Sequence, residues 1–196
     1  IGGSLWIGSA NGANFTSPTS LHILRWWQRM VDSGLALNTG ADPNSFDHLL
    51  ALANGGAAMT IEASSAIGPV AAVLKSGQFG DVDPGAAPLP SIDGRGGVPV
   101  GDGSLWLPNA SSPEKRAAAW IYAQYLLAPE QQAGLAVAGG YAPARSDATK
   151  VPSLVRWWKE HPEYRVGYDQ LVSGPLTPAT TGSLIGDYQA VRNAIR

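Results

Sequence analysis

The 196-residue chain contains no cysteine, which excludes disulfides, cysteine-ligated zinc, iron–sulfur clusters and a thiol nucleophile. Charged residues make up only 14% of the sequence, well below the roughly 25% of an average soluble domain. The formal net charge of -2 gives no electrostatic reason to expect nucleic acid or an anionic membrane as a partner. No apolar run reaches the roughly 20 residues that cross a bilayer. Any basic binding site must therefore be local.

The sequence also lacks the residue patterns on which common enzyme and metal sites depend. No Gly-x-Ser-x-Gly elbow is present, and the three histidines are not spaced as zinc ligands. Asp81 and Asp83 are close carboxylates, but Pro84 follows at once, so a turn is favoured over acid–base chemistry. We therefore expect no enzyme activity, no metal and no cofactor.

Glycine and proline are abundant, with 24 and 15 residues, and they indicate where elements begin and end. Ser17-Pro18 and Ser112-Pro113 each place a capping residue before a proline at the first helical position, and apolar residues then recur at helical spacing. Residues 57–61 are expected to form a short buried strand, and residues 104–107 another short strand. Further helices are expected at 46–53, from Ser64-Ser65 to about Leu74, and at 130–138, 152–160 and 187–196. This alternation predicts an α/β chain.

Three stretches of the sequence together resemble motifs of a known protein family. Residues 112–120 read Ser-Pro-Glu-Lys-Arg-Ala-Ala-Ala-Trp and begin the helix expected at 112–127. Residues 139–145 read Gly-Gly-Tyr-Ala-Pro-Ala-Arg, and residues 54–60 read Asn-Gly-Gly-Ala-Ala-Met-Thr. Together they resemble the bacterial extracellular solute-binding proteins that carry sugars for ABC transporters. The resemblance covers nearly the whole chain, and it implies an α/β, periplasmic-binding-protein-like fold of type II.

Further motifs are similar to one branch of that family, the binding proteins for glycerol 3-phosphate and glycerophosphodiesters. They are Met59-Thr60 leading to Ser64-Ser65, Gly101-Asp102-Gly103-Ser104-Leu105-Trp106, Gly140-Tyr141, and the Gly-Asp-Tyr-Gln-Ala-Val-Arg of residues 186–192. By position, the resemblance implies ligand contacts at Ser64, Ser65, Gly101, Asp102, Gly103, Tyr141 and Arg192. Asp102 departs from the branch, which has glycine there. A carboxylate beside a phosphate is unfavourable, so either a flanking glycine takes the role or the ligand differs.

Each implied contact also has a structural alternative. Ser64 and Ser65 stand at an expected helix N-terminus, which attracts anions and hydroxyl oxygens, but a plain N-cap is the commoner role. Arg192 could grip a phosphate through paired hydrogen bonds, although a single helical arginine is usually solvated. Tyr141 could reach into a cleft or pack over the preceding glycines. Several tryptophans could stack on sugar or choline groups, but most are expected to be packing residues. They are Trp26, Trp27, Trp106, Trp157 and Trp158.

The resemblance also implies how the chain divides between two lobes. Residues 1–98 would form the first part of the C-terminal lobe, 99–140 a returning segment of the N-terminal lobe, and 141–196 the second part of the C-terminal lobe. The beginning of the N-terminal lobe would precede Ile1. We therefore expect the 196 residues alone to bind solute weakly or not at all, because half of the cleft would be missing.

The expected function is capture of glycerol 3-phosphate, a glycerophosphodiester or a related polyol or sugar between two lobes, followed by delivery to ABC permease subunits. The resemblance implies a location in the periplasm or at the bacterial cell surface, with a lipid anchor on the full-length protein. One alternative keeps the class but changes the ligand to a neutral mono- or oligosaccharide. Another is an extracellular interaction domain that carries no ligand. A hydrolase would need a reactive serine with a partnered histidine, and the sequence offers none.

Overall fold

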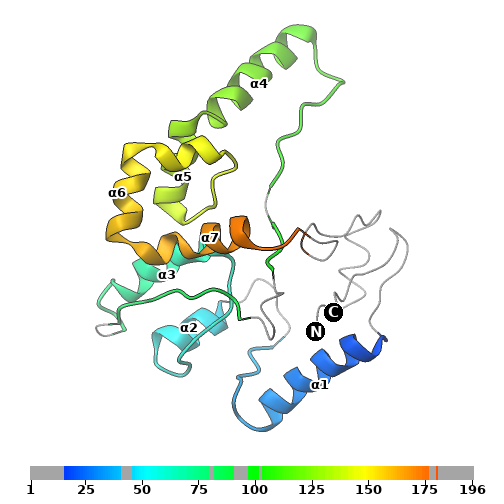
Figure 1. Cartoon of the computed structure of the whole chain (residues 1–196), viewed down its shortest axis with the longest axis vertical. Helices are drawn as coiled ribbons and strands as arrows, with labels where there is room; N and C mark the ends of the chain where they lie inside the picture. The colour runs from blue at the N-terminus through cyan, green and yellow to red at the C-terminus, as the bar shows by residue number, and fades with distance from the viewer. Residues whose placement is uncertain are drawn as a thin grey trace. The chain divides into compact units, whose positions relative to one another are not determined.

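A computed structural model of the chain describes residues 16–40, 46–79, 82–90, 97–101, 103–176 and 180. These residues fall into two compact units. The first unit draws on Ile1–Ile61, Leu89–Val100 and Ser173–Arg196, and the second on Glu62–Pro88 and Gly101–Val172. Figure 1 labels the helices of both units.

The described part of the first unit contains two helices, α1 (Pro18–Asp32) and α2 (Asp47–Ala53). α1 begins as the sequence predicted, because the Ser20 N–H donates to Ser17 Oγ at 3.1 Å and proline occupies the first helical position. Trp26 and Trp27 are both exposed on α1, with their rings in edge contact at a centroid distance of 5.1 Å. The predicted helix at 46–53 is likewise confirmed as α2.

The second unit is a set of short helices joined by 3-10 turns. In chain order its elements are η1 (Ser64–Ala66), α3 (Ile67–Leu74), α4 (Pro113–Leu126), α5 (Pro129–Gly139), η2 (Ser146–Lys150), α6 (Pro152–Glu160), η3 (Pro162–Tyr164) and α7 (Val166–Ser173). Four of them begin with proline at the first position, where the missing N–H costs no hydrogen bond. The helices predicted for residues 64–74, 112–127, 130–138 and 152–160 are confirmed.

α5 and α6 supply the core of the second unit. Ala133 and Ala136 of α5 pack with Leu154 and Trp158 of α6, and all four side chains are buried. Leu154 and Trp158 are four residues apart, so they lie on one face of α6. The two alanines bring the helix backbones close together, and burial of a leucine side chain contributes roughly 1.5–3 kcal/mol. This core holds α5, whose C-terminal end carries part of the candidate site.

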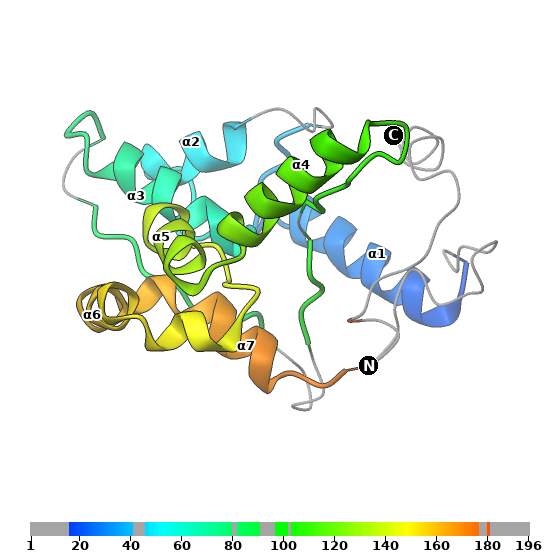
Figure 2. The ribbon, with the colours of Figure 1, turned by 90° about the horizontal axis from the view of Figure 1, so that it is seen from above.

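α4 extends away from the helices around this core, and Figures 1 and 2 agree on that placement within the unit. Its start is well capped, because the Lys115 N–H donates to Ser112 Oγ at 3.4 Å and Arg116 donates to the Ser111 carbonyl oxygen at 3.0 Å. Tyr122 and Tyr125, two of the apolar residues that recur at helical spacing, are exposed. Their rings stack with a centroid distance of 6.4 Å. The sequence thus predicted the helix correctly, but most of the apolar side chains of α4 are exposed to solvent.

The described residues contain no β-strand, so the α/β prediction is not confirmed and the strands predicted at 57–61 and 104–107 are wrong. A strand exists only where another segment pairs with its backbone N–H and C=O groups, and a short apolar run cannot specify that partner. Met59 and Trp106 are each 85% exposed, so these segments are not buried either. The helix predicted at 187–196 lies outside the described residues. Where helices are described, none is long and apolar enough to cross a membrane.

Candidate functional site

Ser64 and Ser65, two of the predicted ligand residues, form the start of η1. The N-cap of η1 is Ala63, in extended conformation, and no side chain caps the turn. The structure thus removes the plain N-cap alternative for both serines. Ser64 is exposed and Ser65 is half-buried. Within the described part of the chain neither hydroxyl is used for capping, so both are available to an incoming polar group.

The Gly140-Tyr141 turn lies directly against Ser64. Gly140 ends α5 in the left-handed conformation, with φ 73°, and its N–H donates to the Ala136 carbonyl oxygen at 2.9 Å. A Cβ atom added at Gly140 would lie 2.7 Å from the Ser64 carbonyl oxygen and would collide with Ile67 Cγ2. The close contact brings together two sequence motifs that the resemblance placed in the ligand site.

A third element, the first turn of α7, meets Ser64 from another side. A Cβ atom added at Gly167 would lie 2.6 Å from Ser64 Cβ and 3.4 Å from Ser64 Oγ. The Tyr164 ring would lie 3.5 Å from a Cβ atom at Gly140. We call these residues the Ser64 junction, which comprises Ser64, Gly140, Tyr141, Tyr164 and Gly167. The sequence analysis predicted neither Gly167 as a site residue nor the helix α7 that contains it.

Tyr141 has the packing role that its sequence context allowed, and it is still partly exposed. A Cβ atom at Gly139 would lie 3.0 Å from two carbons of the Tyr141 ring, so the ring packs over the glycine turn. The residue nevertheless remains 36% exposed. Tyr141 can therefore contact a solute without losing its packing against the turn.

Tyr164 and the two tryptophans of α6 pack among the protein's own aromatic side chains. The Trp157 ring contacts His161 at 3.9 Å and Tyr164 at 5.3 Å, measured between centroids. Trp158 contacts the Tyr168 ring at 5.3 Å, and the Arg165 guanidinium lies 5.5 Å from its centroid. Burial, together with the nearby Glu163 carboxylate, raises the pKa of Tyr164. These contacts make Trp157 and Trp158 packing residues, the alternative that the sequence favoured for most tryptophans.

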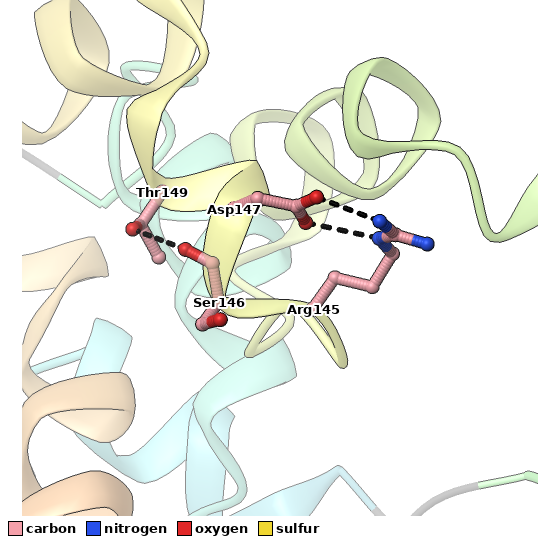
Figure 3. Close-up of polar contacts among 4 residues, drawn as sticks. All are labelled: Arg145, Ser146, Asp147 and Thr149. Atoms are coloured by element: carbon pink, nitrogen blue, oxygen red, sulfur yellow. Dashed lines mark hydrogen bonds and ion pairs between the residues drawn. The ribbon is translucent and has the colours of Figure 1, made fainter.

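After the Gly-Tyr turn, Arg145 is paired within its own segment, as Figure 3 shows. Its Nε donates to Asp147 Oδ1 at 2.9 Å and its Nη2 to Asp147 Oδ2 at 2.6 Å. The hydrogen bonds from Arg145 lower the pKa of Asp147, and those to Asp147 raise the pKa of Arg145. Gln132 fixes the same segment, since its side chain accepts from the Ala144 N–H at 3.0 Å and donates to the Leu126 carbonyl oxygen at 2.9 Å. Arg145 thus shapes the turn instead of offering an unpaired cation.

Gly101 and Gly103 are not among the residues that form the Ser64 junction. Gly101 and Gly103 are exposed, and a Cβ atom added at either would meet no atom within 4 Å. Asp102 and Arg192 lie outside the described residues. Among the residues that the structure describes, no group of three or more histidine, aspartate or glutamate side chains could hold a metal ion.

A family model described as bacterial extracellular solute-binding protein matches residues 1–166. No curated protein matches the chain. The matched segment includes Ser64, Tyr141 and Tyr164 of the junction and ends just before Gly167.

Proposed function

Because the chain belongs to the family of bacterial extracellular solute-binding proteins, we propose that it captures glycerol 3-phosphate, a glycerophosphodiester or a related polyol or sugar. Members of this family act outside the cytoplasm, take up a small molecule and pass it to the permease of a transporter. They are in general not enzymes, and their fold is periplasmic-binding-protein-like. In this proposal, residues 1–98 and 141–196 contribute one lobe of the cleft and residues 99–140 contribute to the other. This division differs from the two compact units, in which α5 and α6 belong to the same unit and share a core.

One observation carries the placement of the solute, namely the Ser64 junction. It brings the Gly140 backbone against the Ser64 carbonyl oxygen and the Gly167 backbone against the Ser64 side chain, and the partly exposed Tyr141 follows Gly140 directly in the chain. Hydroxyl groups and an aromatic ring are suited to a ligand that is itself rich in hydroxyls. We place the solute against Ser64, Ser65 and Tyr141, with Gly101 to Gly103 and Arg192 as the other predicted contacts.

A neutral mono- or oligosaccharide is the second candidate, and the composition of the junction favours it. None of the five residues of the junction is basic. Recognition of a phosphate would therefore need a cation from another part of the protein, and the resemblance suggests Arg192. Asp102 would repel a phosphate beside it. The two candidates therefore differ in whether Arg192 is needed.

We expect a solute of one of these classes to stabilise the full-length protein against heat. At a ligand concentration of 100 Kd the stabilisation is about 2.7 kcal/mol, which a thermal melt resolves easily. The panel would contain sn-glycerol 3-phosphate, glycerophosphocholine, glycerol, maltose and glucose. Arg192→Ala is expected to abolish stabilisation by the phosphate-containing members and to leave that by a neutral sugar unchanged.

The outcomes of this panel separate the proposals. Stabilisation by a phosphate ligand that Arg192→Ala removes supports glycerol 3-phosphate or its esters. Stabilisation by sugars alone, retained in Arg192→Ala, supports the neutral ligand. A protein that no member of the panel stabilises would contradict the proposed ligand classes and favour an interaction domain that carries no solute.

A further inference from the structure

We propose that Gly167 is a positioning residue that determines where the Ser64 hydroxyl stands in the solute site. The inference rests on the function proposed above, because it assumes that Ser64 contacts solute. Gly167 itself lies just beyond the segment that the family model matches. Its role would be to act on the solute through Ser64 and not by contact.

Gly167 is needed for space and not for backbone conformation. It lies inside α7 and is not among the glycines with positive φ, so its backbone is one that alanine also adopts. Glycine weakens a helix relative to alanine, so α7 by itself would gain from a side chain here. A close neighbour is therefore the remaining physical reason for glycine at this position.

The neighbour is Ser64, and it has little freedom to move. A Cβ atom at Gly167 would lie 2.6 Å from Ser64 Cβ and 3.8 Å from Ser64 Cα. Since Ser64 Cβ is bonded directly to the backbone, it cannot rotate away as the end of a long side chain would. On another side the Ser64 carbonyl oxygen already faces the Gly140 backbone without space for a methyl group. Relief of the clash therefore requires η1 and α7 to move apart, which changes the place of the Ser64 hydroxyl relative to α7.

The clash would push η1 and α7 apart, which changes the position of the Ser64 hydroxyl relative to the first turn of α7. Tyr168, the next residue along α7, packs its ring against the buried Trp158 at a centroid distance of 5.3 Å. Arg165 also lies 5.5 Å from the Trp158 ring centroid and pairs with Asp169 at 3.0 Å. The contacts of Tyr168 and Arg165 with Trp158 connect the start of α7 to the core of the second unit, whereas the Arg165–Asp169 pair is local to this segment. Gly167 thus sets how closely Ser64 and the first turn of α7 approach each other.

The test is a double-mutant cycle in the full-length protein, with Gly167→Ala, Ser64→Gly and the pair together. Calorimetric titrations with sn-glycerol 3-phosphate and with maltose measure affinity, and urea unfolding without ligand measures stability. Gly167→Ala is expected to weaken binding of the solute that the protein takes by roughly 3- to 10-fold, the loss of one hydrogen bond. In the Ser64→Gly background the same substitution should change affinity less than about twofold, because the atom that it strikes is gone. Gly134→Ala, in open space on α5, is the matched control and should leave affinity unchanged.

Two results would overturn the proposal when solute binds. One is wild-type affinity in Gly167→Ala, and the other is an affinity loss of equal size in both Ser64 backgrounds. Should neither probe bind the wild-type protein, urea unfolding without ligand still tests the contact between Gly167 and Ser64. A urea midpoint that Gly167→Ala lowers only when Ser64 keeps its Cβ supports the positioning contact. Equal shifts in both backgrounds refute it.

Discussion

Gly140→Ala is expected to lower the free energy of unfolding by about 2–5 kcal/mol, the sum of two separate penalties. The residue has φ 73°, and an L-residue in that left-handed region costs roughly 1–2 kcal/mol. The added Cβ would also collide with Ile67 Cγ2 and lie 2.7 Å from the Ser64 carbonyl oxygen. Overpacking of this kind costs roughly 1–3 kcal/mol, and the struck oxygen belongs to backbone that cannot rotate aside.

Urea unfolding followed by far-ultraviolet circular dichroism measures this change. Gly134→Ala on the same helix is the control, because a Cβ at Gly134 meets nothing within 4 Å. Alanine is the better helix former, so this variant should gain roughly 0.5–1 kcal/mol. A Gly140→Ala protein as stable as the wild type would contradict the close contact between α5 and η1.

Leu154→Ala is expected to cost about 2–5 kcal/mol of unfolding free energy. The Leu154 side chain is fully buried, with 0% exposure, and packs with Ala133, Ala136 and Trp158. Its truncation removes apolar contacts and leaves a cavity. Alanine neighbours have no side chain with which to refill that cavity, so the penalty should fall in the upper part of the range.

Val155→Ala is the matched control for this experiment, because Val155 is the next residue of α6 but is 51% exposed. Its expected cost is below about 0.5 kcal/mol in the same urea titration. Similar costs for Leu154→Ala and Val155→Ala would mean that α6 presents a different face to α5.

The helices could be predicted from the sequence because their start signals are local. Ser17-Pro18 and Ser112-Pro113 each contain a capping oxygen and a proline within two residues, and α1 and α4 begin there. Residues 57–61 and 104–107 were wrongly predicted as strands for the opposite reason. Whether an apolar run becomes a strand depends on a distant partner that the run itself does not encode.

The candidate site was predictable only in part. The family resemblance singled out Ser64 and Tyr141, and the structure places the turn that carries Tyr141 against Ser64. Gly167 could not be recognised, because the reason for a glycine at this position is the close contact with Ser64, which is remote in sequence. Trp157 illustrates the same limit, since its spacing on α6 does not reveal that His161 and Tyr164 cover it.

Calorimetric titration of the full-length protein tests the central claim most directly, with Ser64→Ala compared with Ser153→Ala. Ser153 is an exposed serine of α6 and lies outside the Ser64 junction. If the solute binds at the junction, a ligand from the polyol-phosphate and sugar panel should saturate a single site. Ser64→Ala should weaken that binding by roughly 3- to 10-fold, and Ser153→Ala should leave it unchanged. Saturable binding with the same Kd in both variants would contradict the placement of the solute site at Ser64.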